Sequence, residues 1–323
     1  MPTDEEILET TVQNHNAREQ NVREAARELQ QNMGAVRVSF TWLGTQRKLS
    51  EAQTKQAADT FEAATELVTA SKKLIDTKHP AYKAVTQIKS QVSGYWRSMT
   101  LPYPQDGIRL IRQSDVAVFE EKMQEFRTAL QAAASNLQLE YETIKAGARE
   151  KLGRLYNADD YPASVENVFD IKWEYPAVEP PNYLMSFNPE LYEQERQKIQ
   201  QRFEDAVQLA ENAFAEQLRD LISHLIERLT DNPDGTRKVF RTSAIENFKE
   251  FAENFRRMNV RSNFQLDQLI DQAENLVAGV DLEDLKKSRD VRQTLSTQMT
   301  GVQQALDNLI TNTPRRRVLS MTD

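Results

Sequence analysis

Apolar residues recur every three or four positions between Val116 and Leu155, and this spacing constrains the fold more than any other feature of the chain. The steps run 3, 4, 3, 4, 3, 4, 4, 3, 4, 4 and 3, which is a heptad pattern with small stutters. We therefore predict one continuous helix of roughly 60 Å that starts after Ser114. Its seam would be Val116, Phe119, Met123, Phe126, Leu130, Ala133, Leu137, Tyr141, Ile144, Ala148, Leu152 and Leu155.

A second long helix is expected after Asn188, because asparagine is a favoured N-cap and Pro189 suits the first helical position. Its seam would be Ile199, Phe203, Ala206, Ala210, Phe214, Leu218, Leu221, Leu225 and Leu229. Two such seams predict a mainly α fold, built on a long antiparallel, coiled-coil-like helical hairpin packed with shorter helices. The segments near Val36, Ile108 and Ile171 are β-rich and predict a minimal β element of two or three strands.

These patterns divide the chain into consecutive segments. We expect an N-terminal helix, a small α+β region, the hairpin with an aromatic and proline-rich insert at 157–188, C-terminal helices and a basic tail. The expected ranges are 1–33, 34–113, 114–235, 236–313 and 314–323.

Two further groups of helices are expected inside these segments. Ser50 is the expected N-cap of a helix that runs to Ile75 and breaks at His79-Pro80. The C-terminal segment predicts three helices, at about 242–257, 263–277 and 281–311.

The composition favours a helical protein of a reducing compartment. Only 9 glycines occur in 323 residues, and this low number favours helices. The chain has no cysteine, so disulfides, thiolate metal sites and cysteine nucleophiles are excluded. The formal net charge of −8 gives no global attraction to nucleic acid or to an anionic membrane. An acidic N-terminus and the lack of a long apolar run predict no signal peptide and no transmembrane helix. We expect a cytoplasmic protein without a membrane partner.

The sequence contains no recognised catalytic pattern. Its three histidines, His15, His79 and His224, are expected to be solvated or packing residues. Neither a Walker-type phosphate loop nor a G-x-G-x-x-G motif occurs. We therefore assign no catalytic residue, no metal ligand and no cofactor, and we expect a protein that is not an enzyme.

A metal-dependent nuclease is the enzyme class that these residues permit as an alternative. Asp159 or Asp160, with Asp170 and Lys172 in a strand, would hold Mg²⁺ near a lysine. The simpler interpretation is a solvated loop that leads into an edge strand.

Basic clusters predict a second alternative, the binding of nucleic acid. If several of them converge on one face, they can follow a phosphate backbone despite the acidic total charge. The simpler interpretation is ordinary helix surfaces on which neighbouring carboxylates pair with the cations. The candidate residues are Arg237, Lys238, Arg241, Arg256, Arg257 and Arg261.

The insert at 157–188 is a candidate surface for a protein partner or for self-association. Aromatic side chains are enriched at the centres of protein interfaces. The alternative is that these side chains form a small core that caps one end of the helical bundle. The candidate residues are Tyr161, Trp173, Tyr175, Tyr183 and Phe187.

Short apolar motifs follow one another in the middle of the chain: Lys73-Leu74-Ile75, Leu101-Pro102-Tyr103-Pro104, Gly107-Ile108-Arg109-Leu110 and Leu137-x-x-x-Tyr141. Through them, roughly residues 36–230 resemble a family of uncharacterised bacterial and phage proteins. Members of that family are often encoded beside MoxR-type AAA+ ATPases and proteins with a von Willebrand A domain. The resemblance carries no catalytic residue. It implies a partner role beside such an ATPase, in phage or anti-phage biology.

From these observations we expect a non-enzymatic interaction or scaffold protein, acting as a subunit or adaptor of an AAA+ ATPase-linked complex. The first alternative is a nucleic-acid-binding component of such a complex, and the second alternative is the metal-dependent nuclease.

Overall fold

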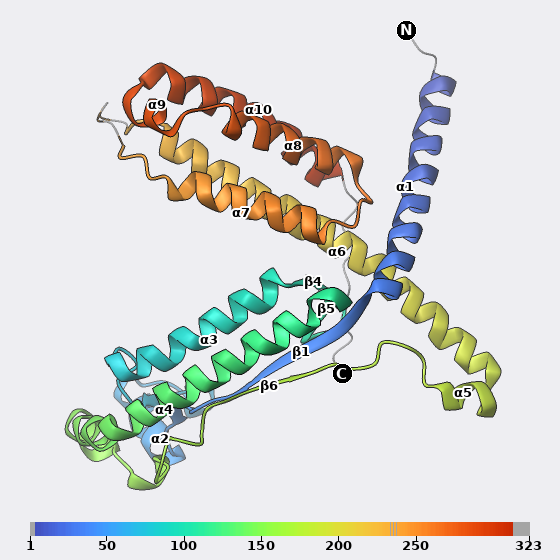
Figure 1. Cartoon of the computed structure of the whole chain (residues 1–323). Helices are drawn as coiled ribbons and strands as arrows, with labels where there is room; N and C mark the ends of the chain where they lie inside the picture. Colours follow the sequence, from blue (N-terminus) through green and yellow to red (C-terminus); the bar gives the residue numbers. More distant parts are fainter. Residues whose placement is uncertain (1–3, 233, 235, 237, 313–323) are drawn as a thin grey trace. The chain divides into compact units, whose positions relative to one another are not determined.

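The computed structural model describes residues 4–312 except 233, 235 and 237, and it is mainly helical, with a small antiparallel sheet (Figure 1). The chain forms two compact units. Unit 1 contains Met1–Ala35, Thr100–Leu110 and Ala177–Asp323, and unit 2 contains Val36–Met99 and Ile111–Pro176. Each unit is therefore built from separate stretches of sequence, whereas the sequence predicts consecutive segments.

Unit 1 is built around α6 (Pro189–Leu229), which packs against helices from both ends of the chain. Asn188 caps α6 by accepting a hydrogen bond from the Leu191 N–H, as predicted. The helix α1 (Asp4–Asn32) crosses α6 and buries a narrow stripe that includes Val22 and Leu29 (Figure 1). The remaining helices are α5 (Asn182–Phe187), α7 (Ser243–Met258), α8 (Phe264–Ala278), α9 (Leu282–Lys287) and α10 (Arg289–Asn312).

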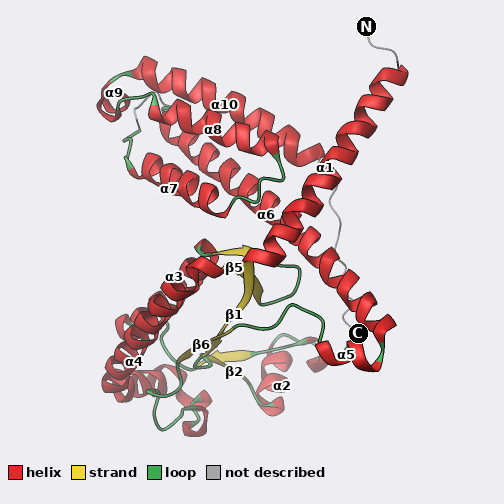
Figure 2. Cartoon of the chain, turned by 45° about the vertical axis from the view of Figure 1, so that its right-hand side comes forward, coloured by secondary structure: helices red, strands yellow, loops and turns green. Residues whose placement is uncertain are grey.

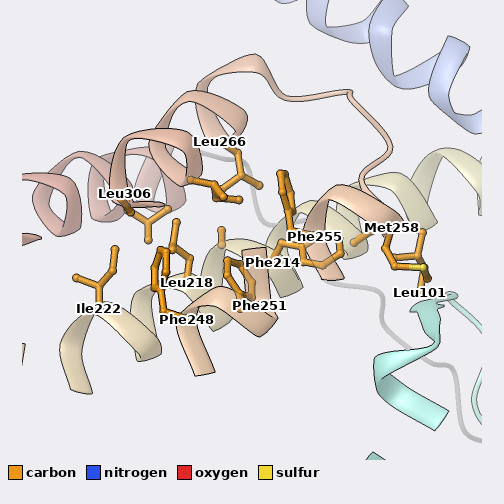
Figure 3. Close-up of a cluster of buried hydrophobic side chains, with 14 of the residues drawn as sticks. Leu101, Phe214, Leu218, Ile222, Phe248, Phe251, Phe255, Met258, Leu266 and Leu306 are labelled. Carbon is orange, nitrogen blue, oxygen red and sulfur yellow. The ribbon is translucent and has the colours of Figure 1, made fainter. Parts of the chain in front are cut away.

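Phenylalanines fill the core of unit 1. Phe248, Phe251 and Phe255 lie one turn apart on α7 and point toward Phe214 and neighbouring side chains of α6 (Figure 3). The rings of Phe214 and Phe255 meet edge to face, with their centroids 5.0 Å apart. Leu266 of α8 and Leu306 of α10 close the same cluster.

Unit 2 is built around α4 (Val116–Leu152), which packs against α3 (Pro80–Ser98) and against the strand β6 (Figure 2). The predicted helix and its buried seam are confirmed, because most of the seam positions from Phe119 to Ala148 are buried. Tyr95 of α3 stacks on Phe119, with the ring centroids 5.7 Å apart. Short 3-10 helices precede and follow α4, at Gln113–Asp115, Gly153–Leu155 and Ala158–Asp160.

The main sheet has the strand order β4-β5-β1-β6. Its strands are β1 (Met33–Thr41), β4 (Thr100–Pro102), β5 (Ile108–Arg112) and β6 (Asp170–Glu174). The pairing of β1 with β6 is antiparallel, with Val38 opposite Trp173 and Phe40 opposite Ile171. The three expected strand segments are confirmed, and β4 adds a fourth. The chain passes from one unit to the other within β1 and again within β5.

The helix predicted from Ser50 to Ile75 is wrong beyond Thr60. Ser50 does cap α2 (Glu51–Thr60), in a capping box with Gln53. The helix then ends in a Schellman-type turn, in which the Ala63 N–H bonds to the Ala58 carbonyl and Glu62 has a φ of 52°. A 3-10 turn (Thr65–Leu67) follows, and β3 (Ser71–Lys73) pairs antiparallel with β2 (Gln46–Lys48).

Two other expectations about the helices need correction. The helix predicted over 281–311 is two helices, because the chain is extended at Ser288, whose hydroxyl accepts the Val291 N–H at the start of α10. The predicted antiparallel pairing of the two long helices is not confirmed. The buried side chains of α4 belong to the core of unit 2, and those of α6 belong to the core of unit 1.

Candidate interaction site

Large apolar side chains remain exposed on α5 and on the first turn of α6. The exposed fractions are 61% for Tyr183, 52% for Met185, 82% for Phe187 and 37% for Leu191. We name these four residues the α5 cluster. Tyr183 and Phe187 lie one turn apart on the same side of α5, and exposed apolar side chains that gather in this way mark a candidate binding site.

The exposure of the α5 cluster follows from the sequence of this short helix. Its apolar residues lie at consecutive and alternate positions, so they point to several sides of the helix. The helix α6 packs against α5 and can cover one of those sides, where Leu184 is partly buried. Tyr183 and Phe187 are one turn apart, and their ring centroids are 6.4 Å apart.

The charges beside the α5 cluster are acidic on balance. Glu193 pairs with Arg196 at 2.8 Å, and Glu195 pairs with Lys198 at 2.7 Å, so these four charges compensate one another. Glu179 and Glu190 are exposed, and among the described residues no cation pairs with either. The cluster is therefore an apolar surface with a negative border.

Only two of the five predicted partner-binding aromatics belong to this cluster. Tyr183 and Phe187 lie in unit 1, whereas Tyr161, Trp173 and Tyr175 lie in unit 2. The structure therefore does not bring the five residues together on one element. Met185 and Leu191 were missed because they are not aromatic, although an apolar run that ends at Asn188-Pro189 is visible in the sequence.

Trp173 and Tyr175 are held by one carboxylate of α4. The Trp173 indole N–H and the Tyr175 hydroxyl each donate to Oε1 of Glu120, at 2.7 Å in both cases. Burial, together with this carboxylate, raises the pKa of Tyr175 well above its usual range. A hollow of about 350 Å³ lies beside Trp173 and is lined by Ser39, Arg127, Ile171, Lys172, Trp173 and Glu174.

Tyr161 packs at the end of unit 2 that contains β2 and β3. Its hydroxyl donates to the Leu74 carbonyl at 2.7 Å, and its ring stacks on Tyr156. Next to it, Asp160 forms an ion pair of 2.6 Å with the nearly buried Lys72, whose ammonium also donates to the Leu155 carbonyl. These contacts attach the segment after α4 to β3.

Two carboxylates of the nuclease hypothesis, Asp160 and Asp170, are engaged in other contacts. Asp160 binds Lys72, and Asp170 accepts hydrogen bonds from Arg127 at 3.2 Å and from the Ile171 N–H at 2.9 Å. No group of three or more histidine and acidic side chains that suits a metal ion occurs in the described part of the chain.

Two histidines have local contacts within helices. His79 Nδ1 accepts the Ala81 N–H at the start of α3, and His224 Nε2 accepts from the Arg228 guanidinium. The side chain of His15 lies outside the described residues.

The predicted nucleic-acid-binding residues are spread along α7. Lys238 and Arg241 precede this helix, whereas Arg256, Arg257 and Arg261 lie at or beyond its last turn, about 20 Å away at 1.5 Å per residue. Arg256 binds Asp271 and Glu274, and Lys238 donates to the Glu227 carbonyl at the end of α6. Arg237 and the basic tail at 314–323 lie outside the described residues.

A buried carboxylate joins three segments of unit 1. Glu211 of α6 accepts hydrogen bonds from Ser262 and Asn263, between α7 and α8, and lies 3.7 Å from Arg18 of α1. Burial raises the pKa of Glu211, and the contacts with Ser262, Arg18 and Asn263 partly oppose that rise. This arrangement holds α1, α6 and the connection between α7 and α8 together, and the nearby carboxylate of Asp267 in α8 adds to the rise in the pKa of Glu211.

Comparison with protein-family models, curated proteins and solved structures finds no match to this chain. A search of the described helices finds none with the length and the apolar character needed to span a bilayer. The exposed apolar side chains of the α5 cluster make it the strongest candidate site.

Proposed function

We propose that this protein is a non-enzymatic interaction protein that binds a protein partner through the α5 cluster. The observation that supports this proposal is the exposure of Tyr183, Met185 and Phe187 on one short helix. Burying such side chains removes apolar surface from water, which favours association, and aromatic residues are frequent energetic centres of interfaces.

The chemistry of the cluster defines the partner. An apolar surface with Glu179 and Glu190 at its border fits a protein segment that presents an apolar stripe flanked by lysine or arginine. The rim charges would mainly accelerate association, and the apolar contact would mainly determine how slowly the complex dissociates.

The first candidate partner is a MoxR-type AAA+ ATPase. This part of the proposal rests on the resemblance of residues 36–230 described above, and it gives the protein the role of a subunit or adaptor of an ATPase-linked complex. We place that complex in the cytoplasm and in phage or anti-phage biology.

The test is a binding measurement between the purified chain and a purified MoxR-type AAA+ ATPase from the same organism. We expect the double variant Tyr183→Ser with Phe187→Ser to weaken binding at least tenfold, because it removes the two largest exposed rings. The double variant Phe61→Ser with Leu67→Ser is the matched control, since these side chains are 83% and 85% exposed but lie in unit 2.

Equal binding by the wild-type chain and the α5 variant would exclude the α5 cluster as the docking site. If the ATPase does not bind, crosslinking from the native host becomes the next measurement, and a partner lost only in the α5 variant would preserve the interaction role without the ATPase. Salt-sensitive binding of DNA or RNA by both variants would favour the nucleic-acid alternative instead.

A further inference from the structure

The strand β6 forms one end of the main sheet. It pairs with β1 on one side, and the strand order places no described strand on its other side. Such an edge carries backbone N–H and C=O groups that another extended chain can pair with. The edge belongs to unit 2 and is independent of the α5 cluster.

The side chains of β6 are arranged so that the strand is complementary to itself. Lys172 and Glu174 are two residues apart and therefore point to the same face of the sheet, while Trp173 points to the other face. In an antiparallel pair with a second β6 that is centred on Trp173, each Lys172 lies opposite Glu174 of the other copy. Opposite charges at directly facing positions stabilise a strand pair, and like charges there destabilise it.

Two neighbouring symmetric registers, centred on Lys172 and on Ile171, are less favourable. A pair centred on Lys172 places two lysines opposite each other and Asp170 opposite Glu174, so both contacts are repulsive. A pair centred on Ile171 requires Asp170 as the partner of Lys172, and Asp170 is already held by Arg127 and by the Ile171 N–H. Charge therefore selects the register centred on Trp173.

The surroundings of β6 suit this pairing. Lys172 is exposed, and among the described residues no carboxylate forms an ion pair with it. Glu174 is 61% exposed and contacts Arg37 at 3.0 Å, so it can accept a second cation. The Trp173 ring is fixed by Glu120, and the hollow of about 350 Å³ beside it leaves space for side chains of the added strand.

We propose that a second copy of this chain binds along β6, antiparallel, with Trp173 at the two-fold axis. The contact is isologous, so it uses the same edge on both copies and closes at a dimer. Pairing also covers an edge that would otherwise be open to uncontrolled association.

The experiment is a charge-exchange series on the full-length chain, followed by sedimentation velocity over a range of concentrations. We expect a wild-type dimer, and we expect Lys172→Glu and Glu174→Lys each to raise the dimer dissociation constant at least tenfold. A mixture of the two single variants should form the heterodimer with near wild-type affinity, because one copy then carries two glutamates and the other two lysines, so that both facing contacts are attractive. The double variant should likewise form a homodimer again.

The control is Lys55→Glu, which makes the same charge change at an exposed position of α2 and should leave the dimer unaltered. Restoration in the mixture separates pairing from misfolding, since a variant that unfolds because Glu174 no longer binds Arg37 cannot be rescued by its counterpart. A wild-type chain that stays monomeric at all concentrations, or single variants that dimerise normally, would overturn the proposal. Single variants that lose the dimer without rescue in the mixture would overturn it as well. None of these results bears on the α5 cluster, whose variants retain β6.

Discussion

Glu211 is a carboxyl group in a place where water cannot stabilise its ionised form. Burial raises its folded-state pKa above the ordinary value of 4.5, so folding favours the protonated carboxyl. The sign of the effect follows from linkage: the favourable contribution is complete below the unfolded pKa and is lost as pH rises through the folded pKa. Ionisation of Glu211 therefore opposes folding as pH rises, even with Arg18 nearby.

We predict that Glu211→Gln increases the free energy of unfolding at pH 7, because glutamine keeps an acceptor for Ser262 without the buried charge. The gain over the wild-type chain should shrink as pH falls toward 4.5. Denaturant titrations between pH 4.5 and pH 8 measure this, with the exposed Glu216→Gln as control. If the free energy of unfolding of Glu211→Gln exceeds that of the wild-type chain by the same amount across this range, the buried charge of Glu211 is not the cause.

At the scale of elements, the contact between Lys72 of β3 and Asp160 joins two segments that are far apart in sequence. Removing one member of a buried ion pair leaves an uncompensated charge, which typically costs about 3–5 kcal/mol. We predict a loss of about 3 kcal/mol in the stability of unit 2 for Asp160→Ala, measured by chemical denaturation. The exposed neighbour Asp159→Ala should have little effect. Lys72→Met combined with Asp160→Leu should cost much less than Asp160→Ala, and an equal cost would show that charge is not the cause.

The elements also show what the sequence could predict. The seams of α4 and α6 were predictable because each repeats over about ten turns. Apolar residues at every third or fourth position over that length indicate an α-helix with one buried face. The end of α2 was not, because Glu62 adopts the left-handed conformation in which a glycine would have been the signal. The partners of α4 and α6 were also not predictable, since a heptad seam specifies a buried face but not the element that covers it.

The candidate site was also predictable from the sequence only in part. Tyr183 and Phe187 were predicted from residue type, because aromatic side chains are expected at interfaces. Their separation from Tyr161, Trp173 and Tyr175 was not predictable, because the change of unit between Pro176 and Ala177 depends on contacts of α6 made with residues far along the chain.

For the whole molecule, the two hydrophobic cores have no residue in common. We predict that Leu29→Ala, in the core of unit 1, destabilises by about 2–5 kcal/mol, with a similar or larger cost for Phe119→Ala in unit 2. Hydrogen exchange should accelerate in α6 and α10 for Leu29→Ala, and in α3 and α4 for Phe119→Ala. Acceleration throughout both units for either variant would show that they unfold as one cooperative body.

The packing of α1 on α6 has a consequence for synthesis. The stripe around Val22 and Leu29 is synthesised before the helix that covers it, which begins about 160 residues later. At about 5–20 residues per second, the nascent chain exposes this stripe for on the order of ten seconds or longer. The many charged and amide side chains of α1 reduce the apolar surface that is open to aggregation during that interval.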